Sequence, residues 1–263
     1  MSDPRLPAVV LISGSGSNLQ ALLDAAVADL PLDLRAVISN RADAYGLERA
    51  ARACVPTRVL DHSRFPDRPA FEAALGELID SFAPELVILA GFMRILTPAF
   101  VARYSGRMIN IHPALLPAYP GLDTHRRVLA AGDEKHGASI HFVTAEVDGG
   151  PVFLQARVAV EPDDDPQTLA ARVLAVEHRL YPTAVRWICA GRVQLRDGRV
   201  WLDGTPLDRP RQLGAADCAA GDRACASPRR ACALPWPWRR ACTPSATCPP
   251  PVPPRNRSGS VTG

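Results

Sequence analysis

The fold is decided by residues 8–20, which are Ala8-Val9-Val10-Leu11-Ile12-Ser13-Gly14-Ser15-Gly16-Ser17-Asn18-Leu19-Gln20. Ala8 to Ser13 is a largely apolar run, as expected of a strand that is buried on both faces of a sheet. Gly14-Ser15-Gly16 then predicts a tight turn, and the apolar positions that follow have a helical period (Leu19, Leu22, Leu23 and Ala26). Ser17, with Gln20 three residues later, predicts a capping box at the start of this helix. A buried strand that leads through glycines into an amphipathic helix is the repeating unit of an α/β fold.

The rest of the body alternates the same two elements. Strand-like runs occupy residues 34–39, 57–60, 85–90, 107–111, 138–143 and 152–160, and helical patterns occupy residues 44–53, 69–82, 98–104 and 126–131. A last helix begins with Asp165 as N-cap and Pro166 as first helical residue, and Tyr181-Pro182 is expected to bend or interrupt it. Asp197-Gly198 predicts a tight turn between short strands at 193–195 and 200–202. We therefore expect a Rossmann-like, mostly parallel sheet with helices on both faces.

The composition changes near residue 214 and divides the chain into two parts. Residues 214–263 contain nine prolines, clustered arginines and no amphipathic period. Residues 1–213 are therefore expected to form one catalytic domain, and residues 214–263 a low-complexity, disordered tail. Translation of GC-rich DNA in a wrong reading frame also yields a sequence of this composition, so a frameshift is a second interpretation of the tail.

The formal net charge of +3 conceals a mildly acidic body. Residues 214–263 hold seven arginines and two aspartates, which leaves residues 1–213 at −2 and without a basic face for nucleic acid. No apolar run reaches the roughly 18 to 20 residues that cross a bilayer, and the N-terminus lacks the apolar stretch of a signal peptide. We expect a cytoplasmic protein with no membrane or nucleic-acid partner, either a monomer or a homodimer.

The cysteines and most histidines do not indicate a metal site. Five of the seven cysteines lie in residues 214–263, where no CxxC pair and no histidine occurs. Cys54 and Cys189 lie in helix-like segments, and we interpret each as a small buried hydrophobe. Five histidines lack metal-like spacing and are interpreted as solvated or structural: His62, His125, His136, His141 and His178.

Candidate catalytic residues follow the fifth predicted strand, in Asn110-Ile111-His112-Pro113. Strand alternation places Asn110 and His112 on one face, where an amide can donate to a developing oxyanion and an imidazole can carry a proton. Met93-Arg94-Ile95-Leu96 and Asp148 follow other strands, so all three segments converge at the carboxyl edge of the sheet. A carboxylate beside His112 would raise its pKa and favour imidazolium. Asp148 before Gly149-Gly150 is equally well explained as a turn former.

The turn after the first strand is a candidate anion site. Its glycines permit close approach of the backbone, and the free N–H groups at the start of the helix favour a phosphate. The stretch Gly14-Ser15-Gly16-Ser17-Asn18 matches neither GxGxxG nor GxxxxGK[ST], so neither a dinucleotide nor a nucleoside triphosphate is indicated. An ordinary turn between strand and helix is the structural alternative.

Together these segments resemble the glycinamide ribonucleotide formyltransferases, the folate-dependent enzymes of purine biosynthesis. The resemblance runs from residue 8 to about residue 208 and rests on the order of six stretches: Ile12 to Gln20, Ser39 to Ala42, Ala90 to Leu96, Ile109 to Pro113, Tyr119 to Gly121 and Asp148 to Pro151. One departure is Ala114, where a serine is common in relatives. No proposed catalytic role depends on that position.

The resemblance implies direct transfer of the formyl group of 10-formyltetrahydrofolate, as co-substrate, to the amine of 5-phosphoribosylglycinamide, without a metal. It implies that Asn110, His112 and Asp148 are catalytic, with Asn110 and His112 holding the oxyanion, Asp148 orienting and charging His112, and a water relaying the proton. It places the folate against Arg68, Met93, Arg94, Ile95, Leu96, Asn110, Thr144, Ala145, Glu146, Val147 and Asp148. It places the ribonucleotide against Gly16, Ser17, Asn18 and Glu177.

Several alternatives stay open at this point. A 10-formyltetrahydrofolate hydrolase or a methionyl-tRNA formyltransferase belongs to the same group, although the expected extra domain before the first strand or barrel after the body is not evident in the sequence. A non-catalytic folate or nucleotide binding protein would retain the pocket, but intact Asn110, His112 and Asp148 argue against it. A nicotinamide-dependent oxidoreductase is disfavoured because GxGxxG is missing and Ser39-Asn40 stands where an acidic residue is expected.

Overall fold

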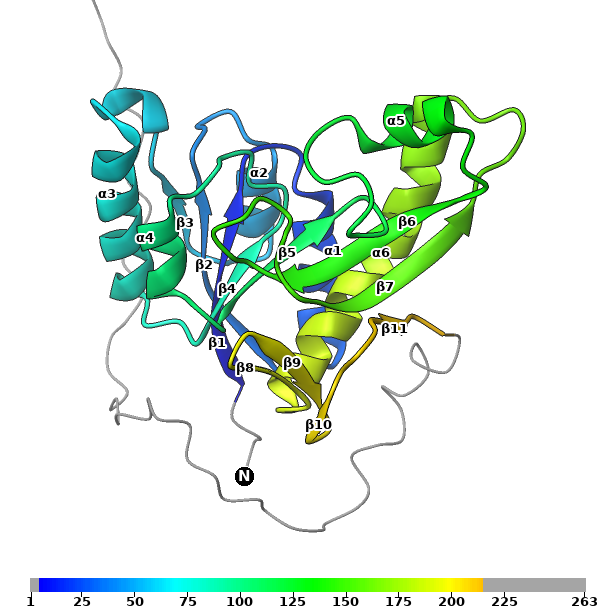
Figure 1. Ribbon diagram of the computed structural model, residues 1–263. Coiled ribbons are helices and arrows are strands. Elements are labelled where there is room, and N and C mark those ends of the chain that lie inside the picture. The colour runs from blue at the N-terminus through cyan, green and yellow to red at the C-terminus, as the bar shows by residue number, and fades with distance from the viewer. Residues whose placement is uncertain (1–4, 215–263) are drawn as a thin grey trace, which may run out of the picture. The chain divides into compact units, whose positions relative to one another are not determined.

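The computed structural model describes residues 5–214 of the chain, and at their centre is an eight-stranded sheet in the order β11-β7-β6-β5-β4-β1-β2-β3 (Figure 1). The strands are β1 (Leu6–Ile12), β2 (Leu32–Ser39), β3 (Thr57–Val59), β4 (Leu86–Leu89), β5 (Met108–His112), β6 (Lys135–Phe142), β7 (Val152–Ala159) and β11 (Arg211–Gln212). Only β6 runs against the others, pairing antiparallel with both β5 and β7. The predicted mostly parallel sheet is confirmed.

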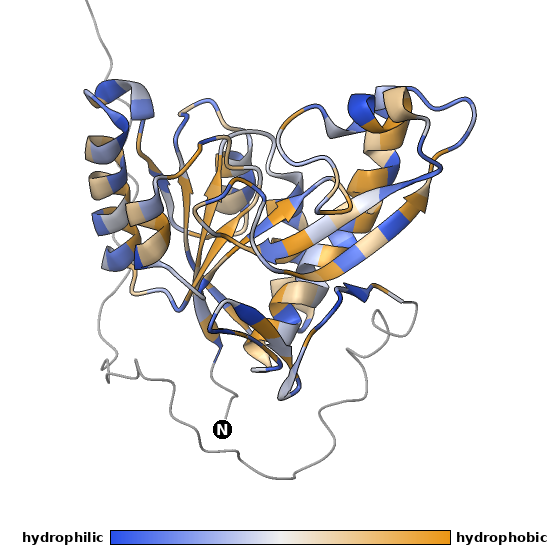
Figure 2. Cartoon of the chain, viewed as in Figure 1, coloured by the Kyte–Doolittle hydropathy of each residue, from blue (hydrophilic) through white to orange (hydrophobic). Residues whose placement is uncertain are grey.

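Helices cover both faces of this sheet, as predicted. They are α1 (Ser17–Ala28), α2 (Gly46–Arg52), α3 (Arg68–Ser81), α4 (Pro98–Arg103), α5 (Thr124–Ala131) and α6 (Pro166–Cys189), with a 3₁₀ turn, η1 (His62–Arg64). Alternate residues of β1 point to opposite faces: Val10 packs in the cluster that includes α1 and α6, and Val9 packs in the cluster that includes α3 and α4. Both side chains are fully buried, and Figure 2 shows the apolar strands enclosed between the helices.

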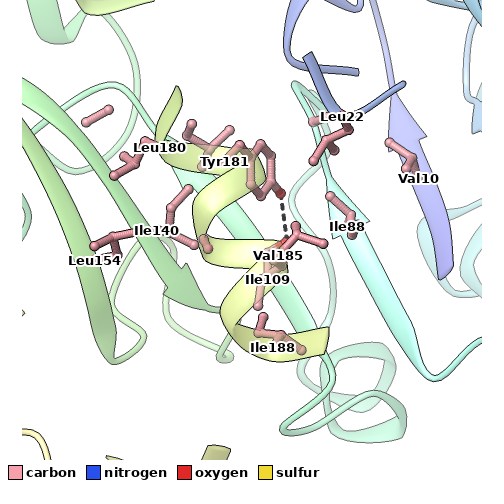
Figure 3. Close-up of a cluster of buried hydrophobic side chains, with 14 of the residues drawn as sticks. Val10, Leu22, Ile88, Ile109, Ile140, Leu154, Leu180, Tyr181, Val185 and Ile188 are labelled. Carbon is pink, nitrogen blue, oxygen red and sulfur yellow. Dashed lines mark hydrogen bonds between the residues drawn. The ribbon is translucent and has the colours of Figure 1, made fainter. Parts of the chain in front are cut away.

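The long helix α6 organises the larger of the two cores (Figure 3). Its N-terminus has the predicted cap, since the Asp165 side chain accepts the backbone N–H groups of Gln167 and Thr168. The helix is continuous through Pro182, so of the two expected effects of this proline, a bend or an interruption, the interruption does not occur. The cost of the missing N–H is offset because the following turns bury apolar side chains, Val185 and Ile188 among them, against the sheet.

The predicted capping box at Ser17 is wrong. The N-cap of α1 is Gly16, with a left-handed backbone (φ 69°), and Ser17 is already the first helical residue. A Cβ at Gly16 would lie 2.6 Å from the Cα of Gly46, so the turn admits glycine for both its conformation and its space. The close packing of two backbones, rather than a side-chain cap, fixes where α1 begins.

The C-terminal hairpin, Cys54 and the residues after 213 were each the subject of a sequence prediction. The hairpin is present as β8 (Val193–Arg196) and β9 (Arg199–Leu202), which join the short β10 (Thr205–Pro206) in a separate antiparallel sheet. Cys54 is exposed and follows the end of α2 with φ 57°, so its interpretation as a buried hydrophobe is wrong. The prediction of a disordered tail concerns residues 214–263, and of these all but residue 214 lie outside the described residues. Among the described helices, none combines the length and apolarity needed to span a membrane.

Candidate active site

A cavity of about 840 Å³ opens at the carboxyl end of β4 and β5. Its walls come from residues 91–96 after β4, residues 110–113 at the end of β5, residues 121–125 before and at the start of α5, and residues 143–148 after β6. The parallel strands β4 and β5 bring their carboxyl ends to one edge. Strand β6 is antiparallel to β5, so residues 143–148 reach this cavity through the path of the loop after β6. Every predicted folate-contacting residue except Arg68 lines this cavity.

Asn110, His112 and Asp148 are brought together at the base of the cavity, as predicted. The Nδ1 atom of His112 lies 3.3 Å from Oδ2 of Asp148, and these side chains are only 6% and 11% exposed. The Nε2 atom of His112 donates to the carbonyl of Tyr119 at 2.9 Å. A neutral ring that donates from Nε2 has an unprotonated Nδ1, so this atom is free to accept a proton beside the carboxylate.

The charge state expected for His112 is corrected by its burial. Burial lowers the pKa of His112 below its ordinary 6.5, even though the Tyr119 carbonyl and the Asp148 carboxylate both raise it. The predicted effect of Asp148 is therefore real in direction but smaller than the loss of hydration. At neutral pH, His112 is a neutral base with a carboxylate in place to stabilise the cation that forms on protonation.

Asp148 is held as an anion by several groups. Burial raises its pKa, but contact with His141, the N–H of Gly121 and the nearby His112 lowers it further than burial raises it. The Gly121 N–H donates to Oδ2 at 2.9 Å. The backbone of Asp148 has φ 53°, so the residue is both a turn former and a member of the site, and the two interpretations left open by the sequence are compatible.

His141 belongs to the site, although its sequence predicted only a structural role. Its Nδ1 donates to the Phe142 carbonyl at 3.0 Å, so its Nε2 faces the site, 3.2 Å from Nδ2 of Asn110 and 3.6 Å from Oδ1 of Asp148. The antiparallel register pairs Asn110 with His141 directly. The strand pattern at 138–143 was visible in the sequence, but its direction and partner were not.

A second, smaller cavity of about 320 Å³ lies beside the start of α1. Ser17 lines it, together with Arg49 from α2 and His178 from α6. The sequence analysis did not assign Arg49 to a site, and it interpreted His178 as solvated or structural. Arg49 donates from Nε to the carbonyl of Ser15 at 2.9 Å, which places a cation over the glycine turn. Phosphate binding would use such a cation together with the N–H groups of the turn.

Asn18 and Glu177 meet next to this turn. The Nδ2 atom of Asn18 donates to Oε2 of Glu177 at 2.7 Å, although 159 positions separate them. Burial raises the pKa of Glu177 to about 7, although the hydrogen bond from Asn18 lowers this pKa. The Oδ1 atom of Asn18 is buried without a hydrogen-bond partner, so this pair retains capacity for a polar ligand.

Two predicted positions stand apart from these groups. Arg68 is the exposed first residue of α3 and lines neither of the two cavities. Ala114 is fully buried, and its carbonyl accepts the hydroxyl of Ser139 at 2.7 Å, so its methyl occupies the core rather than the cavity. No group of three or more potential metal ligands occurs within residues 5–214.

Comparison with known proteins identifies the family. A family model described as formyl transferase matches residues 7–185. The chain belongs to this family. It is 53% identical over 210 residues to the phosphoribosylglycinamide formyltransferase of Escherichia coli strain K12, a match that covers 80% of this chain and 98% of that protein. The resemblance inferred from six short stretches is confirmed.

Solved structures of family members have the same fold. The phosphoribosylglycinamide formyltransferase of Coxiella burnetii superposes with a TM-score of 0.78 at 53% identity, covering 80% of this chain and all of that one (100%). The glycinamide ribonucleotide transformylase 1 of Symbiobacterium toebii gives a TM-score of 0.74 at 46% identity, covering 76% of this chain and 95% of that one.

Proposed function

We propose that this chain transfers the formyl group of 10-formyltetrahydrofolate to the amine of 5-phosphoribosylglycinamide in purine biosynthesis. The observation that carries the proposal is the pair of His112 and Asp148, whose Nδ1 and Oδ2 atoms lie 3.3 Å apart in the wall of a cavity of about 840 Å³. Acyl transfer to an amine releases a proton, and this pair supplies both its acceptor and a counter-charge. The names of the relatives above agree with this activity.

The reaction begins with attack of the substrate amine on the formyl carbon, as the carbonyl π electrons move to oxygen. Asn110 donates to this oxyanion from its amide nitrogen, which carries two hydrogens and makes one contact, with His141 at 3.2 Å. His112, expected as a second donor, has its ring nitrogens against the Tyr119 carbonyl and Asp148, so we assign it the proton instead. His112 takes the ammonium proton, directly or through a water, and becomes an imidazolium that pairs with Asp148. The carbon–nitrogen bond to the folate then breaks, and the leaving nitrogen receives the proton.

One substrate binds on each side of the site. The folate contacts the segments around Met93, Arg94, Ile95 and Leu96, and around Thr144, Ala145, Glu146 and Val147. Arg68, which lines neither cavity, is kept as a folate contact because of the family resemblance. The ribonucleotide contacts Gly16, Ser17, Asn18 and Glu177, with its phosphate at the glycine turn. Residues 1–213 form the catalytic domain in this proposal, which acts on small molecules in the cytoplasm.

The test is release of tetrahydrofolate, followed by absorbance, from 10-formyltetrahydrofolate with and without glycinamide ribonucleotide. Release that requires the amine is the expected result. Release without the amine would instead identify a hydrolase, and no release in either case would favour a binding protein.

A further inference from the structure

Ser13, the residue after β1, lies between the two segments that the proposed function assigns to different substrates. It directly precedes the turn of residues 14–18, and it is only 7% exposed. Its backbone N–H donates to the carbonyl of Gly91 at 3.0 Å, and its Oγ accepts the N–H of Met93 at 2.8 Å. One buried serine therefore holds the start of the segment 91–96 from the side of the glycine turn.

The hydroxyl of Ser13 is also oriented by a second strand. It donates to Oδ1 of Asn40, at the end of β2, at 2.6 Å, and this bond is buried. Nδ2 of Asn40 lies 3.2 Å from Nδ1 of His62 in η1. Because the hydroxyl proton is committed to Asn40, an Oγ lone pair faces Met93, and the serine cannot rotate without breaking both bonds.

The segment 91–96 depends on few such anchors. The Met93 and Ile95 side chains are 68% and 58% exposed, so apolar packing does not hold the tip of this segment. At its far end, the N–H of Thr97 donates to Oε1 of the buried Glu72 at 2.8 Å. Ser13 is therefore the anchor that joins this segment to the glycine turn, whereas Glu72 joins it to α3.

We propose that Ser13 is a positioning residue that couples the binding of the two substrates. An anion held by the backbone N–H groups of residues 14–18 stabilises the position of Ser13, and Ser13 holds Met93 through its Oγ, so each ligand stabilises the segment that the other contacts. Such a coupling is reciprocal by thermodynamic necessity. The inference rests on the proposed function, because that function assigns the ribonucleotide to one segment and the folate to the other.

The experiment measures the dissociation constant of tetrahydrofolate for the full chain by calorimetry, with and without saturating glycinamide ribonucleotide. The wild-type ratio is expected to be about 5-fold or more, within the usual range of couplings between two sites. In Ser13→Ala the ratio is expected to fall toward 1, because the Met93 N–H loses its acceptor. Ser13→Cys, which fills the same space with a poor acceptor, is expected to lower the ratio in the same way as Ser13→Ala. Ser81→Ala, which removes an exposed hydroxyl that donates to Leu78, should keep the wild-type ratio.

The readout is the ratio, which a uniform loss of stability or affinity would not change. A wild-type ratio of 1, or an unchanged ratio in the Ser13 variant that folds, overturns the coupling while leaving the proposed function intact. Failure of the wild-type chain to bind either ligand overturns both. If Ser13→Ala does not fold, Ser13→Cys and the wild-type ratio still decide the question.

Discussion

Replacing Asp148 with asparagine tests whether the reaction uses the charge of this residue. The change keeps the size of the side chain and an oxygen that can accept the Gly121 N–H, so the turn should remain in place. What is lost is the attraction between the carboxylate and the imidazolium that forms 3.3 Å away. With an effective dielectric constant of about 20, two unit charges at this distance attract by about 5 kcal/mol.

The effect on rate is smaller than this figure because both charges are delocalised over two atoms. Taking about half, roughly 2 to 3 kcal/mol, predicts a fall in kcat of about 30-fold to 150-fold. Asp148 also raises the pKa of His112. The acid side of the kcat/KM profile, which reports the free enzyme, lies below pH 6.5 in the wild type because burial lowers the pKa of the base, and it should move to still lower pH in Asp148→Asn.

The assay is tetrahydrofolate release by absorbance, across pH 4.5 to 8, at saturating substrate concentrations for kcat and at concentrations below KM for kcat/KM. Asp203→Asn is the matched control, because it removes one carboxylate that pairs with Arg192 in the β8–β9 hairpin. A variant with kcat within about threefold of the control and an unmoved acid limb would refute the role of the His112–Asp148 pair.

Three other predictions concern the oxyanion, the core and acid stability. Asn110→Ala should fold normally and lose about 100- to 1000-fold in kcat, the usual loss for one oxyanion donor, and near-normal turnover would remove that role. Tyr181→Phe deletes a buried hydroxyl that donates to the Leu89 carbonyl at 2.8 Å, so unfolding in urea should show a loss of about 1 to 3 kcal/mol, and an unchanged midpoint would contradict this. Burial lowers the pKa of His136 to about 4, so the unfolded chain takes up its proton first, and stability should fall as pH drops from 6.5 toward 4. This contribution, about 1 to 2 kcal/mol after allowance for solvent screening, should disappear in His136→Gln when urea unfolding is compared at pH 7 and 4.5.

The sequence predicted those parts of the fold that depend on local pattern. The apolar run at 8–13, the proline at the start of α6 and the Asp197-Gly198 turn are each recognisable from a few adjacent residues, and each was placed correctly. Asn110 and His112 lie at the carboxyl edge by a rule of topology. Asp148 follows the antiparallel strand β6, so it reaches His112 through the path of its loop, which that rule does not predict.

What the sequence did not predict depends on contacts between distant segments. His141 enters the site through its antiparallel pairing with Asn110, and the sequence does not specify that pairing. The cap of α1 is set by the approach of Gly46 to Gly16, so the local Ser17 signal was misleading. The pKa of His112 is lowered, whereas the sequence led us to expect a raised pKa. The difference arises because the burial of His112 is a property of the assembled cavity.

Helix α6 also sets the distance between the two halves of the site. Glu177 lies beside the glycine turn, and one turn later the hydroxyl of Tyr181 reaches the carbonyls of Leu89 and Ile109 on adjacent strands, at 2.8 and 3.4 Å. Helix α6 therefore fixes the distance between the glycine turn, where the ribonucleotide is proposed to bind, and strands β4 and β5. The two contacts lie four residues apart on one helix, so an insertion between Glu177 and Tyr181 would shift the glycine turn relative to β4 and β5 and disturb both sides of the site at once.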